Sequence, residues 1–568
     1  MYNLSTLILY YFLILVAILG YGLFFLKIFR IKSINNDFGY VGLFGIYVLI
    51  IYSYLSNFFI GHSKIHNILL LSIGIGIFLY KILRNYTKYR KEIIITLTVF
   101  IFISSTLFLH KNHDDFPYYH FPYTYYLTQQ SFYVGVGQFN HGFRTASSLF
   151  YLNSLFYLPI AKFYLFHFGA IYIMGFANII LLKNIHNYFL SLNIQKQKIN
   201  ITNYLSLFSL VFINIFFYRI AEHGTDRSAQ ILVFLLIIEL LTFINLKQKT
   251  NNLNLFNLYL LAALIVSLKS FYILYAIFFI PMLLLMRSRS QSYTKAFQFL
   301  IFNRKFILFL LLFLLVIFTN LINTGCIIYP VSLTCFDSMN WGILSEQTLK
   351  MNDHYELWSK GGRTPNSLVT NPSEYIQGFY WVENWMKIYF FNKVSDFILG
   401  LTLLIIIVSL FFKEQFFKKK IKKNNNYIYL IYFILIILLT EWFLNHPALR
   451  YGGYCIIALL FFIPFCLRLE KSKINYNKYS KSVIILIIVT VLVFNIRNFH
   501  RINKEVNFYN YKPIENTNYF INEGGFRIQK KMDNLISQYN NCKKLKNDCN
   551  LETQKIYKKY GKMIFKNR

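Results

Sequence analysis

The stretch HKNHDDFPYYHFPY, residues 110–123, places two adjacent aspartates and three histidines directly after an apolar run. Two neighbouring carboxylates repel each other, which raises the pKa of one of them and suits general-base or metal chemistry. Asp114 and Asp115 are therefore the first candidates for catalytic residues. The alternative is a solvated loop at a membrane surface, in which one aspartate caps a short helix.

The composition indicates a polytopic membrane protein. The chain of 568 residues is 56% hydrophobic, 20% aromatic and only 14% charged, and its mean hydropathy of +0.44 is too high for a soluble protein of this size. The formal net charge of +35 would suggest nucleic acid as a partner for a soluble protein. In a membrane protein basic residues report topology first, so we expect no nucleic-acid partner.

Apolar stretches long enough to span a bilayer predict about fourteen transmembrane helices. The segment 146–160 is apolar but short and stops at Pro159, so we expect it to be re-entrant or interfacial. The predicted fold class is an all-α polytopic transmembrane protein with one helical body, residues 1–496, and a small basic C-terminal segment, residues 497–568. The expected spans lie near residues 3–26, 39–60, 66–83, 93–109, 162–182, 203–218, 229–246, 253–268, 271–286, 306–322, 394–412, 426–443, 451–467 and 482–496.

Basic loops predict the orientation, because short cytoplasmic loops carry an excess of Lys and Arg. With fourteen spans, the basic segments 27–32, 81–91, 287–305, 413–423 and 468–473 fall on one side. The polar loops 110–160, 218–228, 323–393 and 445–453 then share the extracytoplasmic face. The basic segment 497–568 is expected there too, since long translocated segments follow the charge rule poorly.

Four of the six cysteines form two close pairs on that face, Cys326 with Cys335 and Cys542 with Cys549. An oxidising compartment would allow a disulfide in each pair, and thiols without a role are the alternative. Cys455 and Cys466 lie in a predicted span and are expected to be packing residues.

The order Asp115, Tyr119, His120, Pro122, followed by VGVGQFNHGFRTASSLFYLNS at 134–154, resembles the first extracytoplasmic loop of the GT-C superfamily. These proteins are polytopic glycosyltransferases, and the likeness is strongest to poorly characterised bacterial members, over residues 95–160. Weaker similarities are SLKS at 267–270, GCIIYP at 325–330 and HPALRYGG at 446–453. The chain departs from the simplest topology of that family in having three helices ahead of the loop, whose role stays open.

The resemblance implies transfer of a sugar from a polyprenyl-phosphate donor, which enters from the membrane lipid, to a glycan, lipid or protein acceptor of the cell envelope. It implies a site on the extracytoplasmic face of the bacterial inner (plasma) membrane. By position, the catalytic carboxylate of that family falls on Asp115, with Asp114 beside it. A carboxylate would deprotonate the acceptor hydroxyl, and fixed positive charge would bind the leaving phosphate.

Seven further residues are predicted to bind substrate: His120, Arg144, Asp226, Arg227, Lys269, Arg450 and Trp341. Arginine can clamp phosphate oxygens in bidentate fashion, and an idle charge such as Lys269 between two spans is costly. The site requires Asp115 to lie within on the order of 10 Å, one sugar-plus-phosphate length, of Lys269 or Arg450.

Each of these charged residues also has a structural interpretation. Lys269 could snorkel at a tight hairpin, and Arg450 could anchor the chain at the interface. Asp226 could cap the helix that begins near residue 229, with Arg227 paired to Glu222.

Four of the five tryptophans lie in or beside the loop 323–393, at positions 341, 358, 381 and 385. They could form an interfacial belt, or a platform under the apolar face of a sugar. The loop is long enough to cover a site, and the turn KGGRTPNS at 360–367 would let it act as a lid.

No cofactor is predicted. A divalent cation held by His113, Asp114, Asp115 and His120 stays open as an alternative, although no zinc-type spacing is present and hard cations prefer more oxygen ligands. Phosphate-loop, HExxH and GxSxG motifs are missing from the sequence, which argues against an ATP-driven protein, a protease or a lipase.

The alternative functions are a secondary transporter, a flippase or a polysaccharide polymerase of envelope biogenesis. A transporter predicts ionisable residues near the bilayer midplane, broken helices and an internal repeat. The sequence offers Glu239 inside a span, LLIIELLTF, and no repeat.

Overall fold

The computed structural model of the protein describes most of the chain. The described residues are 4–31, 37–109, 115–195, 200–221, 224–245, 252–364, 367–412, 426–470, 476–509, 523–545 and 555–566. The predicted catalytic residue Asp114 lies outside these ranges, as do Glu222, the basic loop 413–423 and Cys549.

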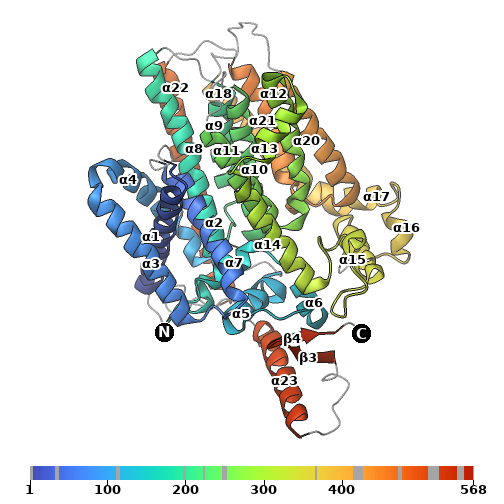
Figure 1. Cartoon of the computed structure of the whole chain (residues 1–568). Helices are drawn as coiled ribbons and strands as arrows, with labels where there is room; N and C mark the ends of the chain where they lie inside the picture. Colours follow the sequence, from blue (N-terminus) through green and yellow to red (C-terminus); the bar gives the residue numbers. More distant parts are fainter. Residues whose placement is uncertain are drawn as a thin grey trace.

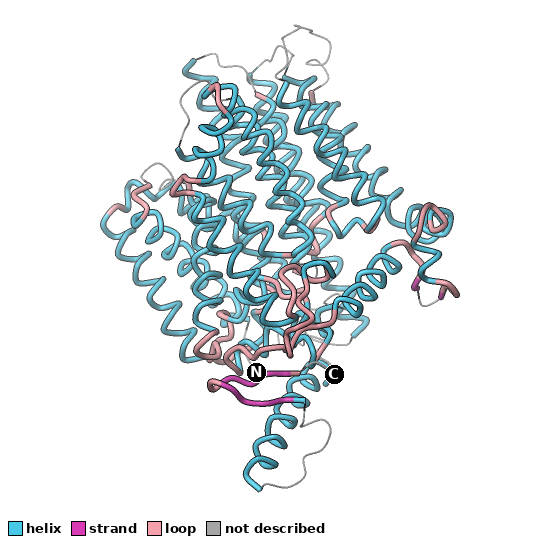
Figure 2. Tube along the Cα trace, turned by 45° about the vertical axis from the view of Figure 1, so that its right-hand side comes forward, coloured by secondary structure: helices cyan, strands magenta, loops and turns pink. Residues whose placement is uncertain are grey.

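The chain folds into a bundle of long helices that run along one common direction (Figures 1 and 2). Eleven helices among the described residues are long and apolar enough to cross a membrane. They are Leu4–Ile28 (α1), Phe38–Asn57 (α2), Lys64–Arg84 (α3), Phe163–His186 (mostly in α8, Phe168–Gln195), Gly224–Asn245 (α10), Ser270–Ser290 (ending in α12, Phe279–Ser290), Phe306–Thr324 (α14), Val382–Phe411 (ending in α18, Ser395–Phe411), Asn426–Asn445 (α20), Gly453–Glu470 (α21) and Tyr479–Phe508 (within α22, Tyr476–Tyr509). The protein is therefore an all-α, multi-pass membrane protein.

Three of the fourteen predicted spans correspond to shorter helices. Two of them are apolar, α9 (Ile201–Phe216) and α11 (Asn252–Leu268). The third prediction, 93–109, corresponds to α4 (Tyr86–Phe102) and a following 3₁₀ helix, Ser104–Phe108. The helix α4 has only 17 residues, and its first turns carry Lys88, Arg90, Lys91 and Glu92, so it is shorter and more polar than the eleven.

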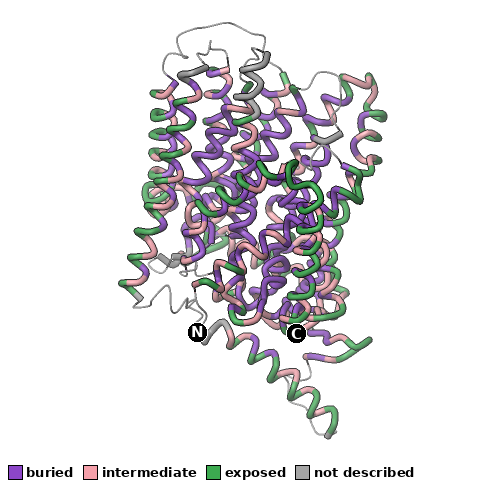
Figure 3. Tube along the Cα trace, turned by 90° about the vertical axis from the view of Figure 1, so that its left-hand side faces the viewer, coloured by how far each residue is buried: buried purple, intermediate pink, exposed green. Residues whose placement is uncertain are grey.

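The outside of the bundle is apolar, as a lipid-facing surface requires. Figure 3 shows buried residues gathered in the interior and exposed residues on the outer helices. Many of the exposed residues of α3, α18, α20 and α22 are large and hydrophobic, among them Leu69, Leu403, Phe433 and Leu492. Water would not favour such a surface, but hydrocarbon does.

Glycines let the first helices approach each other closely. A Cβ on Gly22 would lie 1.9 Å from the Val41 carbonyl oxygen, and one on Gly45 would lie 1.9 Å from that of Ile18. Only residues without a side chain permit this contact between α1 and α2, a device common between membrane helices. The side chain of Asp37 caps the start of α2 by accepting from the backbone N–H groups of Gly39 and Tyr40.

Short elements gather at one end of the bundle, drawn at the bottom of Figure 1. They include a π-helical turn at Phe116–His120, then α5 (Phe121–Gln129), α6 (Val136–Phe139), α7 (Ser148–Ser154) and α15 (Ser345–Ser359). The predicted re-entrant segment 146–160 contains α7, which is buried throughout and too short to cross a membrane. The long loop 323–393 continues with a two-residue hairpin, β1 (Arg363–Thr364) and β2 (Ser367–Leu368), then α16 (Pro372–Ile376) and α17 (Val382–Trp385).

The C-terminal segment packs against the same end. After the last turns of α22, its described residues form α23 (Glu523–Leu545) and an antiparallel hairpin of β3 (Ile556–Lys559) and β4 (Lys562–Phe565). Val134 exchanges backbone hydrogen bonds with Met563 and Phe565, at 3.0 and 2.9 Å. Lys562 Nζ donates to the Phe58 carbonyl oxygen at 2.6 Å. The segment is thus attached to the loop that follows α5.

Cys326 and Cys335 form a disulfide at the start of the loop 323–393. Cys542 is also disulfide-bonded, and its predicted partner, Cys549, lies outside the described residues. Cys455 and Cys466 are unpaired and buried, in agreement with their prediction as packing residues.

Candidate functional site

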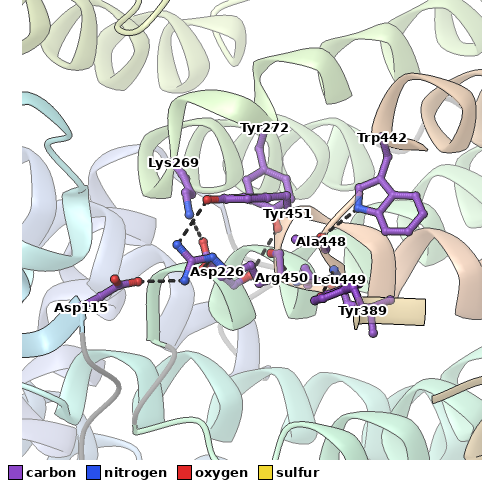
Figure 4. Close-up of polar contacts among 11 residues, drawn as sticks. Asp115, Asp226, Lys269, Tyr272, Tyr389, Trp442, Ala448, Leu449, Arg450 and Tyr451 are labelled. Carbon is purple, nitrogen blue, oxygen red and sulfur yellow. Dashed lines mark hydrogen bonds and ion pairs between the residues drawn. The ribbon is translucent and has the colours of Figure 1, made fainter. Parts of the chain in front are cut away.

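Four charged side chains from distant parts of the sequence meet at the end of the bundle that carries the short elements (Figure 4). Arg450 Nη1 donates to Asp115 Oδ2 at 3.0 Å, and Arg450 Nε lies 3.9 Å from Asp226 Oδ2. Lys269 Nζ forms an ion pair with Asp226 Oδ1. We call these residues the charged cluster. Asp115 and Arg450 therefore lie well within the separation that the sequence analysis requires.

Each member of the cluster stands at the end of a helix. Asp115 immediately precedes the π-helical turn at Phe116–His120, and Asp226 lies in the first turn of α10. Lys269 separates α11 from the 3₁₀ helix Ser270–Phe278, and Arg450 lies in the short helix Leu449–Tyr451 between α20 and α21. Charged groups can lie at helix ends near the membrane surface without the cost of crossing the hydrocarbon.

The cluster is partly shielded from solvent and its charges balance. The side chains of Asp115, Lys269 and Arg450 are 26%, 24% and 22% exposed, and that of Asp226 is 8% exposed. Two carboxylates thus face two cations in a site of reduced water access, where electrostatic interactions are stronger than in bulk water. Burial alone would lower the pKa of Arg450, but the Tyr451 hydroxyl and both carboxylates raise it well above its usual range.

The segment that carries Arg450 is fixed by hydrogen bonds to its backbone. Trp442 Nε1 donates to the Ala448 carbonyl oxygen at 2.9 Å, and Trp385 Nε1 donates to that of Pro447 at 3.0 Å. Gln230 Nε2, from α10, donates to the carbonyl oxygen of Arg450 itself at 3.0 Å. Residues 447–450 are thus held by three different helical segments, so the guanidinium starts from a fixed backbone.

Aromatic rings surround the two cations. Lys269 Nζ lies 4.7 Å from the ring centre of Tyr451, and the Arg450 guanidinium lies 4.9 Å from that of Trp358 and 5.0 Å from that of Tyr451. Trp358 belongs to α15 and remains 42% exposed. Tyr119 is partly buried within electrostatic range of Asp115 and Arg450, and desolvation of its hydroxyl raises the pKa of that group well above the usual range.

His120 lies partly buried beside the cluster and is not a cation at neutral pH. Burial lowers its pKa to about 4, with smaller effects from the four charges of the cluster. Its ring packs against those of Tyr119 and Phe150, and Nε2 has no hydrogen-bond partner among the described residues. The imidazole therefore offers a neutral polar group at the edge of the site.

Arg144 and Trp341, also predicted to bind substrate, belong to a neighbouring part of the same end. Arg144 Nε donates to the Gly137 carbonyl oxygen at 3.0 Å, and Trp341 Nε1 donates to that of Leu321 at 3.1 Å. Tyr355 of α15 lies within electrostatic range of both Arg144 and Tyr451, so this residue connects the two regions. The tryptophan in contact with the charged cluster is Trp358, whereas the described contacts of Trp341 support the loop around Gly135 and Gln138.

Within the described part of the chain, Arg227 forms no ion pair with the residues of the charged cluster. Its guanidinium lies 5.8 Å from the ring centre of Phe217 and within electrostatic range of Arg219 and of Asp226, which belongs to the cluster. Successive residues of a helix face directions about 100° apart, which accounts for the separation. The pair of Arg227 with Glu222 stays a prediction, because Glu222 lies outside the described ranges.

Within the part of the chain that the structure describes, no group of three or more His, Cys, Asp and Glu side chains could hold a metal ion. The cation alternative of the sequence analysis depends on His113 and Asp114, which lie outside that part.

The comparison with known protein families matches residues 5–457 to a family described as Domain of unknown function (DUF8201). The chain belongs to this family. No curated protein and no solved structure matches the chain. The DUF8201 region contains all four residues of the charged cluster together with Tyr451 and Trp358, whereas most of α21, all of α22 and the C-terminal segment lie outside it. The candidate site is thus contained in the matched family region.

Two residues of the site were not predicted from the sequence. Tyr451 was not singled out at all, and Trp358 was not expected to lie next to Arg450. Their contacts depend on how α15 folds over the loop between α20 and α21. With 46 tyrosines in the chain, residue type alone gave no signal for Tyr451; its position directly after Arg450 was the only indication.

Proposed function

We propose that this protein is a glycosyltransferase that moves a sugar from a polyprenyl-phosphate donor to an acceptor of the cell envelope, on the extracytoplasmic face of the bacterial inner membrane. The convergence of Asp115, Asp226, Lys269 and Arg450 at one end of a membrane bundle carries the proposal. Carboxylates and cations held together at a membrane surface suit a lipid-linked phosphate substrate better than they suit a path through the bilayer. The resemblance of residues 95–160 to GT-C loops supports the same reaction.

In this reaction Asp115 is the general base. Its carboxylate accepts the proton of the acceptor hydroxyl while the oxygen attacks the anomeric carbon of the sugar. The new bond joins that carbon to the acceptor oxygen, and the bond to the phosphate oxygen breaks. The phosphate leaves with the bonding electron pair and remains on the polyprenyl chain. Developing negative charge on the phosphate is stabilised by Arg450 and Lys269.

The ion pairs of the cluster suggest an order of events. Asp115 is held by Arg450 at 3.0 Å, and a carboxylate in an ion pair is a weak base. A donor phosphate that binds Arg450 would compete with Asp115 for the guanidinium and release the carboxylate. Asp226 would keep Lys269 in place during this exchange, because the pair is the more buried one. Binding of the donor would thus weaken the ion pair of Asp115 with Arg450 and make the Asp115 carboxylate a stronger base.

The sugar would lie beside Trp358 and Tyr451. Both rings contact the cations that are proposed to bind the phosphate, and the half-exposed indole of Trp358 offers a flat apolar surface. Sugars stack their C–H faces on such rings. In this arrangement α15 covers the site, as the lid hypothesis requires.

We also propose fourteen membrane crossings, made by the eleven long helices with α4, α9 and α11. An even number agrees with the position of the two chain ends. Tyr10, near the start of α1, donates to the Pro159 carbonyl oxygen at 3.0 Å, and the C-terminal hairpin pairs with Val134. Figure 1 marks both chain ends at the bottom of the bundle, where the short elements gather.

The test is the profile of lipid-linked saccharides in cells that carry Asp115→Asn, compared with wild type and a deletion. Asparagine keeps the shape of the side chain and removes the base, so we expect the same unused donor as in the deletion, with transfer reduced about 100-fold or more. Asp396→Asn is the matched control, because Asp396 is an exposed carboxylate at the start of α18. Wild-type profiles in a normally expressed Asp115→Asn strain, with donor accumulation in the deletion, would contradict the catalytic role.

One observation favours a transporter, flippase or polymerase instead. Glu239 lies inside α10, where it accepts hydrogen bonds from Tyr40 at 2.5 Å, Asn254 at 3.2 Å and Asn257 at 3.3 Å. Buried carboxylates within spans often serve ion coupling. Three donors also satisfy a purely structural carboxylate, and this network is separate from the charged cluster. Ion-coupled solute uptake by the protein in liposomes, lost in Glu239→Gln, would favour the transporter over the transferase.

A further inference from the structure

A second polar group, built around Arg144, lies beside the charged cluster. The Arg144 guanidinium lies within electrostatic range of the Tyr329 and Tyr355 hydroxyls and of the His141 ring. Its Nε donates to the Gly137 carbonyl oxygen at 3.0 Å. We call Arg144, His141, Tyr329 and Tyr355 the Arg144 group.

The Arg144 group carries net positive charge. Among the residues that the structure describes, no carboxylate forms an ion pair with Arg144, since the ion pairs found there involve other cations. Burial lowers the pKa of His141 to about 4, with smaller effects from Arg144 and His354, so this imidazole is neutral at pH 7. Arg144 is half-buried, and a cation with reduced access to water is stabilised by an anion. The charged cluster, by contrast, already contains two carboxylates for its two cations.

The Tyr329 hydroxyl is a buried donor. The side chain is 2% exposed, and its oxygen has no hydrogen-bond partner among the described residues. The Arg144 guanidinium is close enough to affect the pKa of this hydroxyl, but the contact lies outside hydrogen-bond geometry. A buried hydroxyl without a partner is costly, so a ligand that accepts its proton would stabilise it.

His141 leaves a second hydroxyl proton available. Its Nδ1 lies 3.5 Å from the Tyr118 hydroxyl, and its Nε2 lies 3.4 Å from that of Tyr355. The Nε2 atom also lies 2.9 Å from Met351 Sδ. A neutral imidazole has one N–H donor and one acceptor nitrogen, so only one of the two tyrosines can donate to it. The O–H of the other tyrosine remains available to a ligand.

An anionic oxygen matches this combination of groups. Carboxylate and phosphate oxygens only accept hydrogen bonds, and bonds from a guanidinium to such oxygens are about twice as strong as neutral ones. The Arg144 group offers a guanidinium and two hydroxyl protons to one region, without a carboxylate that would repel an anion.

The Arg144 group adjoins the charged cluster on two sides. Tyr355 lies within electrostatic range of Tyr451, whose ring contacts both cations of the charged cluster. Ser270, the residue after Lys269, donates to the Tyr329 carbonyl oxygen at 3.1 Å. The two groups are thus neighbours, so substrates held at the charged cluster can place a second anionic group near Arg144.

We propose that the Arg144 group is a subsite for a second anionic group of the substrates, a phosphate or a carboxylate. The assignment to a substrate rests on the proposed function, whereas anion binding itself does not. The anionic group belongs either to a donor whose sugar is linked through a diphosphate or to an acidic sugar of the acceptor.

The test measures the affinity of the full-length protein, purified in detergent, for two pairs of probes. Polyprenyl diphosphate is compared with polyprenyl phosphate, and glucuronic acid with glucose. We expect the wild type to bind the more anionic member of one pair about tenfold more tightly, and Arg144→Gln to remove this preference. Lys387→Gln is the matched control, because Lys387 is an exposed lysine of the loop 323–393 that already pairs with Glu383 at 2.5 Å.

Tyr329→Phe separates a ligand contact from a structural role. The change removes only a buried hydroxyl without a partner, so the midpoint of thermal unfolding should stay the same or rise. The preference for the more anionic probe should nevertheless fall several-fold. If Arg144→Gln does not fold, this variant decides.

The two pairs of probes distinguish the sources of the anion. A preference within the lipid pair assigns it to the donor, and a preference within the sugar pair assigns it to the acceptor; both support the subsite. No preference in either pair would overturn it, as would an equal preference in wild type and Arg144→Gln. A preference lost in Arg144→Gln, together with a wild-type saccharide profile in Asp115→Asn, would support the anion site and contradict the transferase.

Discussion

At the scale of single residues, the charged cluster combines two requirements that oppose each other. A general base must be free to take a proton, yet a carboxylate near a membrane must be compensated. Asp115 meets the second requirement through Arg450. In the proposed reaction, the phosphate of the donor would compete for Arg450 and so help to meet the first. Removing one partner from such a pair costs about 3–5 kcal/mol when the pair is buried. With 22% to 26% of each side chain exposed, the Asp115–Arg450 pair should cost less to break.

His120 gives a prediction on pH dependence. Its pKa is about 4 in the folded protein and about 6.5 in the unfolded chain. The unfolded state therefore binds more protons between these values, so stability falls as the pH drops below about 6.5. At pH 5 the loss from this residue should be about 2 kcal/mol relative to pH 7. In His120→Gln the apparent unfolding midpoint in detergent should shift less between pH 7 and pH 5 than in wild type.

His500→Gln is the control for that experiment, because His500 is exposed on α22 and its replacement should leave the shift unchanged. An identical shift in wild type and His120→Gln would show that His120 is not buried in its neutral form.

The site residues that could be predicted from the sequence were charged residues next to apolar segments, where charged residues are rare. Only 14% of the chain is charged, so Asp226, Lys269 and Arg450 stood out at the ends of apolar segments. Arg227 was just as conspicuous in the sequence. The direction in which its side chain points depends on the residue at which α10 begins, and a single sequence does not define a helix start to within one residue. Tyr451 was one of 46 tyrosines, and its place in the site follows from contacts across the bundle.

At the scale of elements, the segment between α20 and α21 positions Arg450 through its backbone. Long helices were predictable because apolar runs of suitable length require them in a membrane. The π-helical turn after Asp115 and the short helix Leu449–Tyr451 were not predictable, because a few residues have little preference of their own. Tertiary hydrogen bonds, such as those from Trp385 and Trp442, fix such segments.

Trp442→Phe tests this positioning. Phenylalanine retains most of the buried ring but loses the hydrogen bond to Ala448, which should lower stability by about 1 kcal/mol. Because residue 448 is two positions from Arg450, we expect the transfer rate to fall several-fold in an assay of lipid-linked sugar consumption. Trp381→Phe is matched, since Trp381 Nε1 also donates to a carbonyl oxygen, that of Gly378 at 3.0 Å, outside the segment. Equal rates in the two variants would contradict the positioning role.

At the scale of the whole molecule, the site and the C-terminal segment share one end of the bundle. The sequence placed both on the extracytoplasmic side by counting spans, although the basic composition of residues 497–568 argued for the cytoplasm. The contact between β4 and Val134 joins the two, so they must lie on the same side of the membrane. The connection 291–305 lies at the other end, because α12 and α14 both lead to it from the end where Lys269 and Thr324 lie.

This arrangement predicts opposite accessibility for two exposed positions. Tyr560 in the C-terminal hairpin is 92% exposed, and Thr294 at the start of α13 (Tyr293–Ile301) is exposed in the connection 291–305. Since Cys455 and Cys466 are buried, a thiol introduced at either position should dominate labelling of the described part of the chain. We expect a membrane-impermeant maleimide to label Tyr560→Cys in intact spheroplasts and Thr294→Cys only after the membrane is opened. The reverse pattern would place the charged cluster on the cytoplasmic side, where extracytoplasmic transfer from a polyprenyl-linked donor could not take place.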